Sequence, residues 1–203
     1  PVELGKFYSG NGIDELVFLD VMATIENRNI FFDLVSRVAK EINIPFAVGG
    51  GIKTIEDIKN LLSAGADKVS IGSVAVTDPG FISQAAQEFG SQCIVISVDP
   101  KKEGDFWKIY IKGGRERTDV DVIDFVKDME SRGAGELLVN SLDRDGTKDG
   151  YDIKLLKVIN KVTNLPVIAS SGAGKKEHFL EAFTVGKADA ALAASLFHYG
   201  ELS

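Results

Sequence analysis

Three aspartates follow short apolar runs of the sequence, in positions where they could exchange protons with a substrate. Asp20 follows ELVFL, Asp99 follows CIVISV, and Asp143 follows ELLVNSL. A carboxylate that comes directly after a buried strand faces the loop end of a parallel sheet, where it can act as a general acid or base. We expect this role for Asp99 and for Asp145. For Asp20 and Asp143 we favour helix capping or a loop ion pair.

Corners rich in glycine and serine are the second group of residues that could hold a ligand. Two of them, at residues 49–51 and 72–73, lie in the first half of the chain, and two, at residues 170–174 and 194–195, lie in the second. Glycine lets backbone N–H groups approach a ligand closely, and a helix that begins there favours an anion. The alternative for each corner is a simple turn from strand to helix. Two pairs of corners predict two phosphate sites on opposite sides of one barrel mouth.

These residues must be positioned by strands that alternate with helices along the whole chain. Runs rich in β-branched residues predict seven strands, at residues 15–20, 45–49, 68–73, 93–99, 136–143, 166–170 and 190–195. Apolar residues at helical spacing predict helices that include residues 55–64, 81–89, 122–132 and 152–161. Such alternation, at roughly 25–30 residues per unit, is typical of a (β/α)8 TIM barrel. After Asp99, residues 105–111 and the following glycine pair predict a small hairpin within a long loop.

The chain also repeats itself. GIDELVFLD is similar to GAGELLVNSLD, and INIPFAVGGGI is similar to TNLPVIASSGA, with Pro45 and Pro166 at matching positions. A four-unit half that occurs twice predicts an α/β barrel in one domain spanning residues 1–203, with half-barrels at about 1–90 and 91–203. The repeat places a counterpart of the strand at Asp99 about 20 residues before Pro1. We therefore expect a barrel truncated to about seven strands, without its first strand and last helix, and impaired relative to a complete one.

Three charged residues begin alternate strands of this barrel: Glu15, Lys68 and Glu136. Alternate strands supply one layer of interior side chains, so the three side chains should meet at the end of the barrel opposite the loops that carry the aspartates. Bulky aliphatic residues normally fill such a layer. The charges could form a solvated rim, or they could form a polar gate for a small molecule that enters from below.

Composition excludes several classes of function. The net charge of −7 disfavours general binding of nucleic acid or of an anionic membrane. One cysteine and two histidines exclude a Cys-based metal cluster and leave little room for a His-rich site. No apolar run reaches the roughly 18 residues of a membrane span, and nothing indicates secretion. We expect a cytoplasmic protein.

Several segments, in the same order, resemble the cyclase-subunit family of imidazole glycerol phosphate synthase, in histidine biosynthesis: DELVFLD, VGGGI, GADKVSI, SLDRDGTKDGYD, IASSGAG and LAASLFH. The resemblance covers essentially the whole chain. It implies a lyase in which ammonia, supplied by a glutaminase subunit or fused glutaminase domain, attacks a phosphoribulosyl aminoimidazole-carboxamide ribonucleotide. Imidazole glycerol phosphate and the carboxamide ribotide are released. The resemblance implies no metal or redox cofactor.

The resemblance also implies roles for particular residues. Asp99 matches one member of a catalytic pair, as the general acid, and the other member would lie on the expected missing strand. The charges that begin alternate strands match the family's ammonia gate. The matched substrate contacts form two phosphate groups and a middle group: Gly50, Gly51, Gly72 and Ser73; Gly146, Gly172, Ala194 and Ser195; and Asn140 and Asp145.

Two other interpretations of the sequence remain. A sister phosphoribosyl isomerase of the same pathway also has two phosphate sites and a two-fold repeat. It would not need the charges at the closed end or the DRDGTKDGYD loop, so both features favour the cyclase. The third reading is a catalytically inactive truncated barrel that serves as a scaffold, which the expected absence of the first strand makes a serious alternative.

Overall fold

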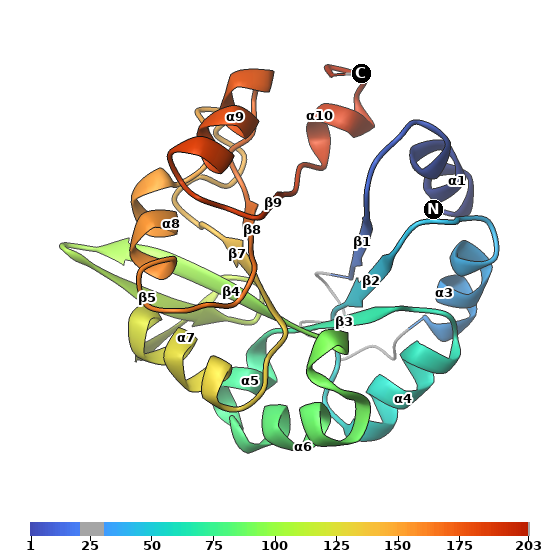
Figure 1. Cartoon of the computed structure of the whole chain (residues 1–203), viewed down its shortest axis with the longest axis horizontal. Coiled ribbons are helices and arrows are strands. Elements are labelled where there is room, and N and C mark those ends of the chain that lie inside the picture. The colour runs from blue at the N-terminus through green and yellow to red at the C-terminus, as the bar shows by residue number, and fades with distance from the viewer. Residues whose placement is uncertain (21–30, 203) are drawn as a thin grey trace.

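A curled sheet of parallel strands forms the centre of the molecule (Figure 1). The computed structural model describes residues 1–20 and 31–202. The parallel strands, in spatial order, are β1 (Leu16–Leu19), β2 (Phe46–Gly49), β3 (Lys68–Ile71), β4 (Ile94–Glu103), β7 (Glu136–Asn140), β8 (Val167–Ser170) and β9 (Ala190–Ala191). This confirms the predicted TIM-barrel class with about seven barrel strands.

Helices alternate with these strands and surround them in Figure 1. They are α1 (Val2–Gly10), α3 (Phe32–Ala39), α4 (Ile55–Ser63), α5 (Ser73–Thr77), α6 (Gly80–Phe89), a 3-10 turn η1 (Ser91–Cys93), α7 (Val122–Ser131), α8 (Ile153–Ile159), α9 (Lys176–Thr184) and α10 (Ser195–His198). None of these described helices is long and apolar enough to cross a membrane.

The strands are apolar on both faces because helices cover the outside of the sheet while side chains fill its inside. Val69 and Ile96, on adjacent strands, are completely buried. Helix α4 packs on this sheet through Ile58 and Leu61, which are also completely buried. Its start is fixed by a capping box, in which Thr54 Oγ1 accepts from the Asp57 backbone N–H. The cap therefore fixes the chain immediately after the corner at residues 49–51.

The two parts of the sheet related by the sequence repeat carry the same hydrogen bond. Asp67 Oδ2 accepts from the backbone N–H of Phe46 at 2.9 Å, and Asp189 Oδ2 accepts from the backbone N–H of Val167, also at 2.9 Å. In each case the aspartate comes just before one strand, β3 or β9, and fixes the start of the strand before it in the chain, β2 or β8. The same local device thus aligns β2 with β3 and β8 with β9.

Strand β4 differs from its prediction. It does not end at Asp99 but continues to Glu103, and this extension pairs antiparallel with β5 (Phe106–Ile111). Strand β6 (Glu116–Asp121) adds to β5, so the expected hairpin is part of a three-stranded ribbon. The prediction was wrong because the extension is polar and owes its strand conformation to pairing with β5, which is not a local signal.

Strands β1 and β9 lie at the two ends of the parallel path. Helices α1 and α10 lie beside these strands, and the ends of the chain approach each other (Figure 1). Tyr8 Oη is 3.2 Å from His198 Nδ1, so the first and last described helices are in direct contact. This contact joins parts of the chain that are 190 residues apart.

Candidate functional site

Asp99 and Asn140 meet where two neighbouring strands approach the loop end of the barrel. Strands β4 and β7 are paired in parallel, which brings the two side chains to the same level. Asn140 Nδ2 donates to Asp99 Oδ1 at 2.9 Å and to Ser97 Oγ at 3.0 Å. The amide therefore fixes the orientation of the carboxylate that the sequence selected as the general acid.

Burial raises the pKa of Asp99 above that of an ordinary aspartate. The hydrogen bond from Asn140 opposes this rise because it favours the ionised form. The negative charge of Asp145 raises the pKa further. A carboxyl group whose protonated form is favoured in this way is better suited to donate a proton than an exposed one. The raised pKa therefore agrees with the role expected of Asp99.

The residues predicted for the second phosphate line one pocket of about 310 Å³. We call Gly146, Gly172, Ala194 and Ser195 the second corner; Asp145 lies beside them in the same pocket. The volume falls near the lower end of the range for small-molecule sites, about 300–1,000 Å³. The pocket lies among the segments that follow β7, β8 and β9.

Hydrogen bonds join the three segments around this pocket. Gly150 N–H donates to the Gly172 carbonyl at 2.7 Å, and Tyr151 Oη donates to the Leu192 carbonyl at 3.0 Å. His178 Nδ1 accepts from the Gly174 N–H at 3.0 Å, so this histidine orders the corner. The pocket wall is therefore built by the fold before any ligand arrives.

The first corner, Gly50, Gly51, Gly72 and Ser73, lies at the ends of β2 and β3, which are paired. Gly50 has φ +105°, and a Cβ at this position would collide with the carbonyl oxygen of Asp20. Only glycine fits this close approach. Ser73 Oγ accepts from the Lys112 N–H at 2.9 Å, which docks the β4–β5–β6 ribbon on this corner.

Asp143 and Asp145, in the loop after β7, have different surroundings. Asp143 Oδ2 accepts from the Lys102 N–H at 2.7 Å, so it joins the loop after β7 to the extension of β4. Asp145 is exposed and lines the pocket of the second corner. The structure therefore supports a loop role for Asp143 and keeps Asp145 at the candidate site.

The three charges expected at the opposite end of the barrel do converge. Lys68 Nζ donates to Glu15 Oε2 at 2.9 Å and to Glu136 Oε1 at 2.7 Å. The side chains of Lys68, Glu15 and Glu136 are 19%, 26% and 21% exposed, so the cluster is mostly withdrawn from water. Burial lowers the pKa of Lys68, but the two carboxylates outweigh it and the net pKa is raised.

Ser70 is two residues along β3 from Lys68, on the same face of the strand, and is 3% exposed. Neither its Oγ nor Glu15 Oε1 has a hydrogen-bond partner within the described part of the chain. Polar atoms therefore continue from the charged cluster into the barrel.

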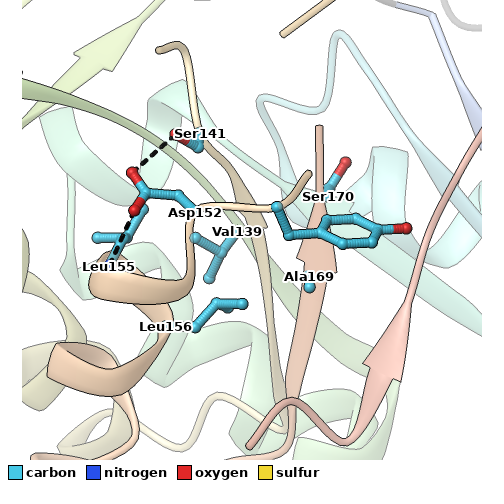
Figure 2. A pocket seen from close by; sticks show the side chains of 8 residues that line it. Val139, Ser141, Asp152, Leu155, Leu156, Ala169 and Ser170 are labelled. Atoms are coloured by element: carbon cyan, nitrogen blue, oxygen red, sulfur yellow. Dashed lines mark hydrogen bonds between the residues drawn. The ribbon is translucent and has the colours of Figure 1, made fainter. Parts of the chain in front are cut away.

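A second, narrow gap lies between β7, β8 and α8, and it has no room for a water molecule. Figure 2 shows the apolar side chains of Val139 and Leu156 around it. Asp152 accepts from the Leu155 N–H at 3.0 Å and from Ser141 Oγ at 3.2 Å, which caps α8. This gap is part of the packed core.

Sequence reasoning missed Lys148 among the residues of the second corner. Lys148 lines the pocket from the loop after β7, close to the selected residues Asp145 and Gly146. Its place in the DRDGTKDGYD segment was the available signal. Among the described residues there is no group of three or more His, Cys, Asp or Glu side chains that could hold a metal ion.

Comparison with known proteins shows the family of this chain. A family described as "Histidine biosynthesis protein" matches residues 1–203. Imidazole glycerol phosphate synthase subunit HisF of Hydrogenobaculum sp. (strain Y04AAS1) is 55% identical over 204 residues, covering 100% of this chain and 81% of the relative. The subunit of the same name from Synechocystis sp. (strain PCC 6803) is 55% identical over 207 residues, covering 100% and 79%. That of Nostoc sp. (strain PCC 7120) is 53% identical over 207 residues, covering 100% and 80%. The chain therefore belongs to the histidine-biosynthesis family that includes the HisF subunits of imidazole glycerol phosphate synthase.

Proposed function

We propose that this chain is the cyclase of imidazole glycerol phosphate synthase, a lyase of histidine biosynthesis. It uses ammonia to convert a phosphoribulosyl aminoimidazole-carboxamide ribonucleotide into imidazole glycerol phosphate and the carboxamide ribotide. The observation that carries the proposal is the pairing of Lys68 with Glu15 and Glu136 at the end of the barrel opposite Asp99. A sister isomerase has no use for a polar layer at that end.

The substrate carries a phosphate at each end, and we assign one phosphate to each corner. The first corner offers backbone close to Gly50 and the second offers the pocket around Gly172. A substrate held at both ends places its middle beside Asp99 and Asn140. Asp99 then donates a proton to the reacting group, which the raised pKa supports.

Ammonia is small and can be neutral, so it can pass a narrow polar layer that excludes ions. We assign the Lys68 layer to this entry and the surrounding face of the barrel to a glutaminase, as a separate subunit or a fused domain. The names of the relatives, each a synthase subunit, support an assembly of this kind. We expect the enzyme to act in the cytoplasm.

The direct test supplies ammonium salt and the ribonucleotide and follows both products by chromatography. It compares the chain alone with a chimaera that adds the segments of the Hydrogenobaculum relative lying outside the match. We expect the chimaera to form both products. Isomerisation of a ribonucleotide without ammonia consumption would instead support the sister enzyme. Phosphate binding without turnover in either protein would support the scaffold reading.

A further inference from the structure

An ion pair lies at the rim of the second-corner pocket and joins segments that are far apart in the chain. Lys148 Nζ donates to both carboxylate oxygens of Glu201, each at 2.7 Å. Lys148 lines the pocket, whereas Glu201 follows α10 in the last described residues. The pair therefore ties the loop after β7 to the end of the chain across the side of the pocket.

The backbone of Lys148 is held in an uncommon conformation. Its φ is 59°, in the left-handed region that non-glycine residues rarely adopt. A Cβ on Gly174 would collide with the Lys148 carbonyl oxygen, so the loop lies directly on the segment that follows the second corner. Such a conformation persists where the surroundings enforce it, and it is frequent at ligand sites.

Lys148 is also the one cation among the described residues that line this pocket. Within that same set, the other charged residue is Asp145, which repels an anion. A phosphate monoester carries about −1.5 to −2 charges at neutral pH, and the chain has a net charge of −7. Uncharged donors alone, the backbone N–H groups and the serine hydroxyls of the lining, would therefore have to bind a dianion in a negative field unless Lys148 contributed its charge.

We propose that Lys148 is a phosphate-binding residue of the second corner and that Glu201 competes with the phosphate for it. This inference rests on the proposed function, because it concerns the phosphate assigned to the same pocket. The Lys148 and Glu201 side chains are 48% and 39% exposed. Ion pairs as exposed as this contribute little to stability and break readily, so an arriving phosphate can take over the ammonium group. Phosphate binding then releases the segment after α10, and phosphate departure restores the ion pair.

The experiment titrates the isotope-labelled chain with glycerol 3-phosphate and follows the backbone amide of Gly172 by NMR. The Gly50 amide reports the first corner in the same spectra. Three variants are compared with the wild type: Lys148→Met, Glu201→Gln and Lys187→Met. Lys187 is the matched control, because it is an exposed lysine with φ 62° that does not line the pocket.

Opposite shifts are expected for the two partners. Lys148→Met should weaken binding at Gly172 by about five- to tenfold, since a charge-assisted contact is lost. Glu201→Gln should tighten it by about two- to fivefold, since the competing carboxylate is removed. Lys187→Met should change it by less than about twofold, since an exposed charge away from the pocket is screened. Binding at Gly50 should not distinguish Lys148→Met from Lys187→Met.

Two results would overturn the proposal. If both Lys148→Met and Glu201→Gln weaken binding, the ion pair only stabilises the structure of the pocket. If neither changes binding more than Lys187→Met does, Lys148 does not contact phosphate. A wild-type chain whose Gly172 amide never responds would instead reject the phosphate assignment of the second corner, and with it the proposed function at this pocket. The proposed competition between Glu201 and phosphate for Lys148 can therefore fail while the phosphate site stands.

Discussion

The burial of Asp99 has opposite effects on the stability of the folded protein and on its activity. Burial, with the charge of Asp145, raises its pKa, so the folded state binds its proton more tightly than the unfolded state does. The stabilising contribution is therefore complete at low pH and is lost as the pH rises through the folded-state pKa. Above that pKa, the ionised carboxylate costs folding free energy that a neutral side chain would not.

In the chimaera, Asp99→Asn should lower turnover by about 10²–10⁴-fold, the usual contribution of a general acid. The same variant should have a higher melting temperature than the wild type at neutral pH, and the difference should shrink as the pH falls. Turnover assays and thermal unfolding at several pH values test both parts. Near-full turnover would remove Asp99 from the chemistry, and a melting difference that grows toward low pH would contradict the raised pKa.

Two glycines of opposite corners should respond differently to the same substitution. Gly172 has φ +95°, and a Cβ there would collide with the Gly150 carbonyl oxygen. Gly72 leaves room, because the nearest atom to its Cβ would be Ser97 Cβ at 3.8 Å. We expect Gly172→Ala to lower the free energy of unfolding by about 1–3 kcal/mol, through backbone strain and disturbance of the hydrogen bond between Gly150 and Gly172.

Gly72→Ala is the matched control and should change the free energy of unfolding by less than about 1 kcal/mol. Urea denaturation of both variants measures the difference. Equal destabilisation by the two substitutions would show that the close approach at Gly172 is not what the corner requires.

At the scale of elements, two hydrogen bonds to side-chain acceptors fasten the β4–β5–β6 ribbon to the barrel mouth, beside the backbone bond from the Leu142 N–H to the Pro100 carbonyl. One is the contact of the Lys112 N–H with Ser73 Oγ, and the other is that of the Lys102 N–H with Asp143 Oδ2. Each uses a side chain from a barrel loop as the acceptor. The ribbon is therefore held between the first corner and the loop that carries Asp145.

Removal of one fastening should loosen the ribbon on that side only. Asp143→Ala should speed hydrogen exchange at the Lys102 amide and lower the free energy of unfolding by about 0.5–1.5 kcal/mol, the usual net value of a hydrogen bond. The Lys112 amide, which Ser73 still holds, serves as the internal control. Equal acceleration at both amides would indicate that the ribbon moves as one body. A large loss of turnover without faster exchange would return Asp143 to the catalytic candidates.

The sequence was informative about elements wherever a local pattern determines them. The buried strands have continuous apolar runs, and the repeat placed their ends, so the positions of Gly50 and Gly172 could be predicted. The polar extension of β4 could not, because its strand conformation comes from pairing with β5. Nor could the contact between Lys148 and Glu201, which are 53 residues apart and carry no sequence signal for each other.

The charged layer, formed by Glu15, Lys68 and Glu136, was predictable for a different reason. In a barrel, alternate strands place their first residues in one layer, so Glu15, Lys68 and Glu136 could be brought together from topology alone. The hydrogen bond between Asn140 and Asp99 depends on side-chain rotamers and on the register of adjacent strands. The sequence selected both residues but could not join them.

At the scale of the whole molecule, the charged layer and Asp99 lie at opposite ends of one barrel. The layer holds two carboxylates and one ammonium group, so it keeps one excess negative charge and gives Lys68 two partners. Breaking a buried pair by removal of one partner leaves uncompensated charge and is destabilising. A test of ammonia entry must therefore separate delivery from a general loss of stability.

The last prediction makes that separation with two assays and a charge-balanced control. In an assembly with the proposed glutaminase, Lys68→Met should spare turnover driven by added ammonium salt, because Asp99 and both corners are at the other end of the barrel. Turnover driven by glutamine should fall by about tenfold or more, since two uncompensated carboxylates draw in cations and water and close the path to neutral ammonia.

The triple variant Glu15→Gln, Lys68→Met, Glu136→Gln removes all three charges and should recover stability. If glutamine-driven turnover returns in the triple variant, charge balance controls the entry. If it does not, Lys68 itself is required for delivery. Equal losses in the two assays for Lys68→Met would instead make the layer a structural feature of the core, with ammonia entering elsewhere.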